Sequence, residues 1–340
     1  MYAPRYTITD VLLGRISDAE TLRTKIASAP VQVVWLESIR FESLIRRAHF
    51  STAIEGNPLT LPEVEALAES RAIPGAERAK REVLNYLAAL RWIIKQPSAT
   101  PVTESAVLKL HRLLMSSLLE AQHVGAYKTS ANVIMSAGRV VYRPPGPTFA
   151  KSGSRALMQW LEGSGRAVHP IIASACAHYE MARLHPFRDG NGRVARALAT
   201  WVLYHRRFDT QHLLAVDQYY KEDHEGYYQA LQRVRQEHED LTSWLEYVAL
   251  AVLRTLARTL QRIEQLAVPP IARGLSLTRQ QEKLLLALRG RQGTTIEELQ
   301  RILGVERAQV YRILHPLVAR RLIGKSTTRP VTYRMADSPT

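Results

Sequence analysis

The sequence has only one cysteine, Cys176, among its 340 residues. A single cysteine excludes a disulfide bond within the chain and suits a reducing compartment, so we expect a cytoplasmic protein. The residues around Cys176 are apolar, which predicts a buried thiol rather than a reactive one. No uninterrupted apolar run approaches the length of a membrane span, and residues 1–6 (MYAPRY) lack the apolar core of a signal peptide. We therefore expect no association with a membrane.

Acidic residues are also scarce relative to basic ones. The chain has 31 Asp and Glu against 46 Lys and Arg, which gives a formal net charge of +15. Residues 269–340 alone hold 13 Lys and Arg but 5 Asp and Glu, a net charge of +8. Such a concentration of positive charge suits the phosphate backbone of a nucleic acid, although basic charge can also serve solubility in general.

The hydrophobic content of 46% is enough for two domains or more. The pattern from residue 10 to residue 266 is almost entirely helical, apart from two short β-rich runs. We predict an N-terminal helical region over residues 1–100 and a core over residues 101–266. A Pro-rich linker would follow at residues 267–274, and a C-terminal domain at residues 275–340.

Residues 185–196 (HPFRDGNGRVAR) are the most informative stretch of the chain. The apolar pattern upstream predicts a helix that ends before Pro186, because proline disfavours helical geometry in the residue that precedes it. A second helix is predicted over residues 193–207. The two glycines between these helices permit left-handed conformations, which turn successive N–H groups toward one point. Because the N-terminus of the second helix faces the same point, the sequence predicts an anion-binding loop.

The charged side chains of this stretch suit a nucleotide polyphosphate. Arg193 and Arg196 are neighbours on the second helix and could each bind a phosphate through two hydrogen bonds. Asp189 would repel phosphate but could hold Mg²⁺, which prefers one or two carboxylates plus phosphate oxygens. His185 has a near-neutral ordinary pKa and suits a general base. A capped turn with a solvated basic face explains each residue singly, but it does not explain all of them together.

The stretch resembles the signature of the Fic family, His-x-Phe-x-Asp-Gly-Asn-Gly-Arg-x-x-Arg, and matches it at every fixed position. Most Fic proteins transfer AMP from ATP to a hydroxyl side chain of a target protein. The resemblance therefore implies a mainly α fold, in which a helical Fic core carries a small β-hairpin flap. It also implies that His185 is the catalytic base and that Asp189 binds Mg²⁺.

The same resemblance assigns the contacts to ATP. The loop of Gly190, Asn191 and Gly192 would hold the α- and β-phosphates. Arg193 would bind the β-phosphate and Arg196 the γ-phosphate. Relatives with lysine in place of the second glycine transfer the terminal phosphate instead, and Gly192 argues against that reaction.

Residues 51–56 (STAIEG) resemble the inhibitory motif of the family, Ser/Thr-x-x-x-Glu-Gly/Asn. The resemblance implies that Glu55 pairs with Arg196 and thereby competes with the γ-phosphate. An ordinary helix end, followed by Gly, Asn and Pro, explains the same residues. In some family members this glutamate supports the removal of AMP from a target, and that activity is an alternative here.

Two further features resemble parts of the family site. The β-rich runs at residues 125–134 and 140–145 predict a hairpin that turns at Gly138. It is similar to the Fic flap, which aligns an extended segment of the target by β-strand addition; a structural hairpin that covers a helix is the alternative. Tyr227 and Tyr228 resemble the tyrosine pair near the adenine, although aromatic core packing explains them equally well.

The pattern of residues 275–340 comprises three helices and then two short strands, which resembles a winged helix–turn–helix domain. The third helix, residues 306–321, would enter the major groove of DNA, where Arg307, Gln309 and Arg312 would contact bases or backbone. Winged helices also dock proteins, so both partners remain open. The rival to an enzyme is a nucleotide-responsive DNA-binding regulator with a silent catalytic site. Family resemblance also implies a homodimer.

Overall fold

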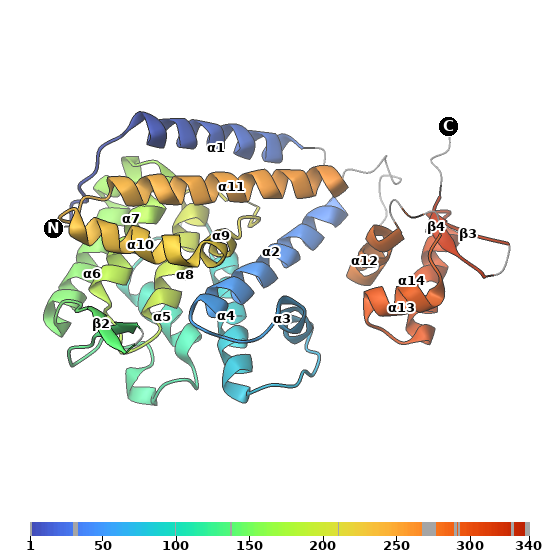
Figure 1. Ribbon diagram of the computed structural model, residues 1–340, viewed down its shortest axis with the longest axis horizontal. Coiled ribbons are helices and arrows are strands. Elements are labelled where there is room, and N and C mark those ends of the chain that lie inside the picture. Colours follow the sequence, from blue (N-terminus) through green and yellow to red (C-terminus); the bar gives the residue numbers. More distant parts are fainter. Residues whose placement is uncertain are drawn as a thin grey trace. The chain divides into compact units, whose positions relative to one another are not determined.

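The computed structural model of the chain describes all residues except 1, 30–32, 99, 137, 210, 267–276, 289–290, 292, 328–329 and 337–340. The described residues form two compact units, one of residues 1–27 and 42–260 and the other of residues 28–41 and 261–340. The predicted linker at 267–274 lies outside the described residues. The predicted fold class, a mainly helical chain with small hairpins, is confirmed (Figure 1).

The helices of the larger part of the chain are joined by short loops and by two 3-10 turns, at Ala121–His123 and Ser164–Ala167. The helices are α1 (Asp10–Ser28), α2 (Val33–Ile54), α3 (Leu61–Ala68), α4 (Glu77–Lys95), α5 (Glu104–Met115), α6 (Pro147–Glu162), α7 (Pro170–Leu184), α8 (Asn191–His205), α9 (Val216–Glu222), α10 (His224–Gln236) and α11 (Thr242–Leu266). The strands β1 (Ile134–Ser136) and β2 (Arg139–Tyr142) form an antiparallel hairpin.

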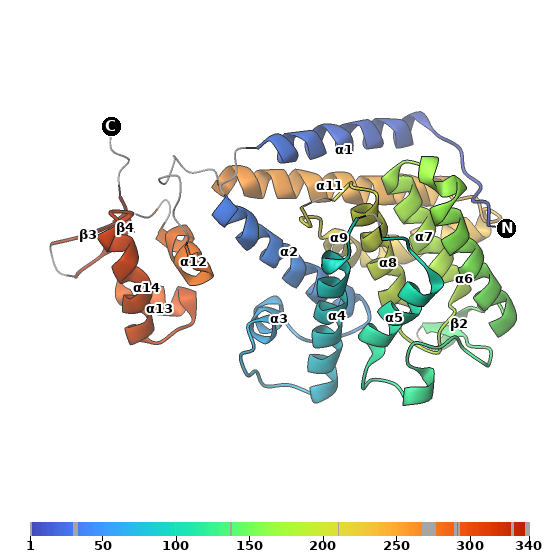
Figure 2. The same cartoon turned by 180° about the vertical axis from the view of Figure 1, so that it is seen from behind.

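Helices α7 and α8 form the centre of the larger unit, and both views show other helices around them (Figures 1 and 2). Both are buried over most of their length, which explains why their sequences are apolar nearly all round. The Ser174 hydroxyl donates to the Ala199 carbonyl at 2.8 Å and joins the two helices. The Trp244 indole N–H donates to the Ala175 carbonyl at 2.8 Å and joins α11 to α7. The loop between α7 and α8 is therefore carried by the most buried part of this unit.

Cys176 lies in the middle of α7 and is fully buried. The prediction of a buried cysteine is confirmed. Burial also raises the pKa of its thiol, which disfavours the reactive thiolate. Among the described helices, none combines the length and the apolar character that crossing a bilayer requires.

Arg47 fastens α2 to the loop that follows α8. Its Nε donates to the Leu214 carbonyl at 2.6 Å, and its guanidinium pairs with the Asp209 carboxylate; both charged side chains are buried. Replacing Arg47 with alanine leaves the buried Asp209 carboxylate with backbone N–H donors from Leu213 and Leu214 but with no opposite charge. We therefore expect the free energy of unfolding to fall by about 3 kcal/mol or more. Denaturation in urea measures this. As a control, Arg46→Ala removes a partly exposed pair with Glu42 and should lower the free energy of unfolding by less than about 1 kcal/mol. Equal losses for the two variants would contradict a stabilising role of the buried Arg47–Asp209 pair.

The C-terminal part has the element order of a winged helix–turn–helix domain. It consists of α12 (Arg279–Leu288), α13 (Ile296–Leu303), α14 (Arg307–Ala319), β3 (Ile323–Lys325) and β4 (Tyr333–Met335). The two strands pair antiparallel, with Gly324 opposite Arg334. Thr295 and Glu298 form the predicted capping box at the start of α13, and Gly304 ends that helix in a left-handed conformation.

Candidate active site

His185 ends α7 in a left-handed conformation with φ of 46°, and Pro186 follows it. Its Nδ1 lies 3.4 Å from the Ala182 carbonyl, a contact that suits a protonated Nδ1 and leaves Nε2 as the acceptor. Burial lowers the pKa of His185 to about 4, and the nearby Lys128 charge acts in the same direction. The imidazole is therefore neutral near pH 7 and can take up a proton.

Phe187 and Asn191 fix the shape of the loop that follows. Phe187 is fully buried and stacks on the His111 ring, with centroids 3.9 Å apart. The Asn191 side chain accepts from the Phe187 N–H at 2.8 Å and donates to the Phe187 carbonyl at 2.9 Å. Because both ends of this amide are used within the loop, a phosphate contact from Asn191 would come from its backbone N–H.

His111, on α5, supports the loop from the other side, and no sequence motif indicated it. Its Nδ1 accepts from the Gly125 N–H at 2.9 Å, so its Nε2 is the donor to the Asp189 carbonyl, 3.1 Å away. Burial lowers the pKa of His111 to about 4, which keeps the ring neutral and this pattern intact at neutral pH. Asp189 is thereby held by its backbone while its carboxylate stays about half exposed.

The two signature glycines are required by their surroundings. Gly190 precedes α8 in a left-handed conformation with φ of 78°, and a side chain there would collide with the Met115 sulfur. A side chain on Gly192 would collide with the Glu55 carboxylate and would lie 3.2 Å from the Arg196 guanidinium. Glu55 therefore lies against the glycine loop itself, at the start of α8.

Arg196 is buried, and residues at the end of α2 engage its guanidinium. Its Nε donates to the Ser51 hydroxyl at 2.7 Å, and one terminal nitrogen donates to the Ser51 carbonyl at 2.9 Å and to Glu55 Oε1 at 2.7 Å. The ion pair that the resemblance implied is thus present. Burial favours a raised pKa for Glu55, but the Arg196 charge holds it below its usual range, so the pair is charged at neutral pH.

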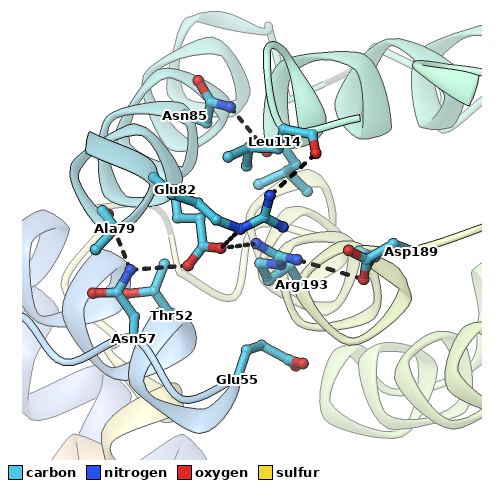
Figure 3. Close-up of polar contacts among 12 residues, drawn as sticks. Thr52, Glu55, Asn57, Ala79, Glu82, Asn85, Leu114, Asp189 and Arg193 are labelled. Atoms are coloured by element: carbon cyan, nitrogen blue, oxygen red, sulfur yellow. Dashed lines mark hydrogen bonds and ion pairs between the residues drawn. The ribbon is translucent and has the colours of Figure 1, made fainter. Parts of the chain in front are cut away.

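Arg193 has different surroundings, which Figure 3 shows. One terminal nitrogen lies 3.7 Å from Glu82 Oε1, and the other lies 3.6 Å from Asp189 Oδ1. Only 5% of Arg193 is exposed, yet its Nε and one terminal nitrogen have no hydrogen-bond partner among the described residues. The structure brings together both signature arginines. Ser51 and Glu55 engage Arg196, whereas Arg193 keeps N–H donors for a ligand. Glu82, on α4, was not predicted.

The two tyrosines proposed near the adenine differ in their surroundings. Tyr227 is 2% exposed, its hydroxyl is 2.9 Å from His178 Nε2, and its ring stacks on Tyr220 with centroids 4.9 Å apart. Tyr228 is 45% exposed. Core packing therefore accounts for Tyr227, and of the pair only Tyr228 offers a ring to a ligand.

The predicted hairpin is present, with Gly138 at its turn in a left-handed conformation. Apolar side chains of the hairpin and its flank are exposed, namely Val133, Met135, Val140 and Val141. The Tyr142 hydroxyl donates to the Arg183 carbonyl at 3.1 Å, and the Arg235 guanidinium lies over the Tyr142 ring. The hairpin thus contacts the end of α7, close in sequence to His185, while the apolar side chains of the hairpin stay exposed to solvent.

The three residues predicted to contact DNA lie on α14. Arg307 and Arg312 are exposed, although Arg307 pairs with Glu297 at 2.8 Å. Gln309 is half-buried, and its amide donates to the Gln280 side chain on α12 at 3.3 Å. The structure thus turns Gln309 toward a neighbouring helix, so the two arginines are the better placed for a phosphate backbone.

A comparison with known families matches residues 101–203 to the Fic/DOC family. The matched residues include His185, the glycine loop and both signature arginines, so this part of the chain is similar to a Fic domain. A second match joins residues 273–338 to the family of the sugar-specific transcriptional regulator TrmB, which agrees with the winged helix–turn–helix order of the C-terminal elements.

Animal proteins are among the relatives of this chain. It is 29% identical over 242 residues to the protein adenylyltransferase Fic of Nematostella vectensis, an alignment that covers 69% of this chain and 53% of the relative. It is 30% identical over 173 residues to the protein adenylyltransferase fic-1 of Caenorhabditis elegans, which covers 49% of this chain and 33% of the relative. The chain therefore spans about half, or less, of the length of these relatives.

A solved structure shares the fold over the full length of both chains. It is a Fic family protein from Desulfovibrio desulfuricans, with a TM-score of 0.70 and 24% sequence identity. The Fic-1 structure from C. elegans matches 75% of this chain and 73% of that one, with a TM-score of 0.63 and 23% identity. At these identities the structures establish the Fic fold.

Proposed function

We propose that this protein is a Fic-type protein adenylyltransferase, which transfers AMP from ATP to a Ser, Thr or Tyr hydroxyl of a target protein. The observation that carries the proposal is a neutral His185 next to a glycine loop and two buried arginines. The names of the relatives support AMP transfer over its removal or a silent site. The exposed apolar hairpin supports docking of an extended target segment along the flap.

The reaction follows from the positions of these groups. The target hydroxyl gives its proton to Nε2 of His185, and its oxygen attacks the α-phosphorus. The bond between that phosphorus and the bridging oxygen breaks, so pyrophosphate leaves and AMP remains esterified to the target. Backbone N–H groups of Gly190, Asn191 and Gly192 and the guanidinium groups of Arg193 and Arg196 would stabilise the charge on the phosphates. Tyr228 would contact the adenine.

Asp189 fits a magnesium ion that is bound together with the nucleotide. Its carboxylate is about half exposed and makes one short hydrogen bond, from the Gly190 N–H at 2.6 Å, which leaves oxygen lone pairs free. No group of three or more potential metal ligands occurs among the described residues, so phosphate oxygens would supply the other ligands. The ion would neutralise charge on the leaving pyrophosphate.

Glu55 would inhibit this reaction. Arg196 is engaged by Ser51 and Glu55, so the γ-phosphate cannot reach it while the pair is intact. The Glu55 carboxylate also lies against the glycine loop, where it would repel a triphosphate. ATP would then bind with its α-phosphate out of line for attack.

The test is to incubate wild type, Glu55→Gly and Glu55→Gly/His185→Ala with α-labelled ATP, Mg²⁺ and host lysate. Label on protein that is strong for Glu55→Gly and absent for the double variant supports both AMP transfer and the inhibitory role. If no sample is labelled and DNA binding responds to ATP, the result would favour the alternative function, a nucleotide-responsive DNA-binding regulator whose catalytic site is silent. A homodimer stays a prediction of the family resemblance.

The C-terminal domain would bind DNA, because its relatives include a transcriptional regulator and because α14 exposes Arg307 and Arg312. We expect the Arg307→Ala/Arg312→Ala variant to weaken binding of duplex DNA and to reduce the slope of log Kd against log salt by about 2. Fluorescence anisotropy over a salt series measures both. Arg71→Ala/Arg81→Ala removes equal charge from exposed positions of the other unit and should leave the slope unchanged. Equal slopes for the two variants would contradict a DNA-binding α14.

A further inference from the structure

Arg193 and Arg196 lie one turn apart on α8, but different kinds of contact hold them. Arg196 donates hydrogen bonds to Ser51 and Glu55, as described above. Arg193 has carboxylates at 3.6 and 3.7 Å, which is beyond hydrogen-bond distance but close enough for strong attraction in a buried position. A buried guanidinium needs such compensating charge. Arg193 is therefore held electrostatically while N–H donors stay available.

Glu82 is the better fixed of the two carboxylates beside Arg193. Its side chain is 15% exposed, against 48% for Asp189. Glu82 Oε2 accepts from the Asn57 amide at 2.9 Å (Figure 3). Arg78 Nε lies 3.6 Å from Oε1. One carboxylate oxygen of Glu82 thus accepts a hydrogen bond, and the other lies near a second positive charge, both from groups outside α8.

Asn57 connects Glu82 to the turn that carries Glu55, two residues earlier in the sequence. The amide nitrogen of Asn57 also donates to the Ala79 carbonyl at 3.0 Å, and its oxygen accepts from the Leu59 N–H at 3.1 Å. With both ends of the amide engaged, Asn57 cannot rotate away from Glu82. The turn that carries Glu55, which pairs with Arg196, therefore also carries Asn57, which holds Glu82 beside Arg193.

We propose that Glu82 is a positioning residue, which holds the Arg193 guanidinium where it binds the β-phosphate of the nucleotide. This inference rests on the nucleotide site of the proposed function. In that site Asp189 would turn to Mg²⁺, so Glu82 would be the carboxylate that remains beside Arg193. Because its attraction uses no N–H donor of Arg193, it fixes the side chain without competing for the hydrogen bonds that a phosphate needs.

The experiment compares the affinities of Glu82→Gln for Mg²⁺-ADP and for AMP by calorimetry. Glutamine keeps the shape of the side chain and can still accept from Asn57, but it removes the charge that attracts Arg193. We expect Kd for ADP to rise on the order of tenfold, the lower end of the loss seen when a group that orients a metal-binding side chain is removed. Kd for AMP should not change, since AMP has no β-phosphate. Glu77→Gln is the matched control, because it removes the same charge from an exposed site on the same helix.

A double-mutant cycle tests whether Glu82 acts through Arg193. Glu82→Gln should weaken ADP binding much less in an Arg193→Ala background than in wild type. Glu82→Asp, which keeps the charge but shortens the side chain, should give an intermediate loss and serves where Glu82→Gln does not fold. Unchanged ADP affinity, equal losses for ADP and AMP, or tighter ADP binding would each overturn the proposal. Because these measurements need no transfer reaction, failure of AMP transfer would be seen separately.

Discussion

Replacing His185 with alanine in the Glu55→Gly protein is expected to lower AMP transfer by about two to four orders of magnitude, the usual contribution of a general base. The target hydroxyl has a pKa far above neutrality, so its oxygen attacks efficiently only if a neighbour takes the proton. His185 suits this because its Nδ1 faces the Ala182 carbonyl and its Nε2 remains an acceptor. Label transferred from α-labelled ATP in single-turnover conditions measures the loss.

The control for this prediction separates chemistry from binding. Since His185 makes no phosphate contact in the proposed site, the variant should bind Mg²⁺-ADP as the parent does. His315→Ala changes an exposed histidine of α14 and should leave the rate unaltered. Full transfer by the His185 variant would falsify the role of this residue.

The pH dependence of the rate checks the same assignment independently. Burial lowers the His185 pKa to about 4, so the imidazole stays unprotonated at pH values where an ordinary histidine, near 6.5, gains a proton. A base acts in its unprotonated form. The rate should therefore be flat from neutral pH down to about pH 5 and should fall as pH decreases through about 4. If the rate instead fell to half its neutral value near pH 6.5, burial would not lower the pKa of this imidazole.

Local features of the site could be predicted from the sequence because neighbouring residues determine them. Pro186 ends α7 at His185, and the glycines of the following loop permit its left-handed turn. The capping box of Thr295 and Glu298 was likewise predictable, because its two residues are only three positions apart. The Glu55–Arg196 pair is a long-range contact, and it was expected only because both motifs resembled those of one family.

The supporting residues could not be predicted, because their roles depend on packing between helices far apart in the sequence. His111 on α5 and Glu82 on α4 follow ordinary helical patterns that give no sign of the loop they support. Periodicity also fails to tell which of two adjacent side chains is buried. Tyr227 lies in the core while Tyr228 is exposed, and Gln309 turns toward α12 while Arg307 faces solvent.

Replacing Glu55 with glycine is expected to raise AMP transfer by about a hundredfold, the cost in rate of misplacing a reacting group by about 1 Å. The change removes the carboxylate that accepts from Arg196 at 2.7 Å and that lies against Gly192. Arg196 can then turn to the γ-phosphate, and the α-phosphate can come into line with the incoming hydroxyl. Initial rates with labelled ATP measure the gain.

Two companion variants show whether the gain comes through Arg196. Glu55→Ala removes the carboxylate without the backbone freedom of glycine, so it should activate nearly as much as Glu55→Gly. Glu55→Gly/Arg196→Ala should lose most of the gain, since the released guanidinium is what would bind the γ-phosphate. Because Glu55 contacts Arg196 and not Arg193, its removal should tighten ATP binding more than ADP binding. An unchanged rate, with ADP still bound, would mean that the Glu55–Arg196 pair stabilises the fold and does not regulate the enzyme.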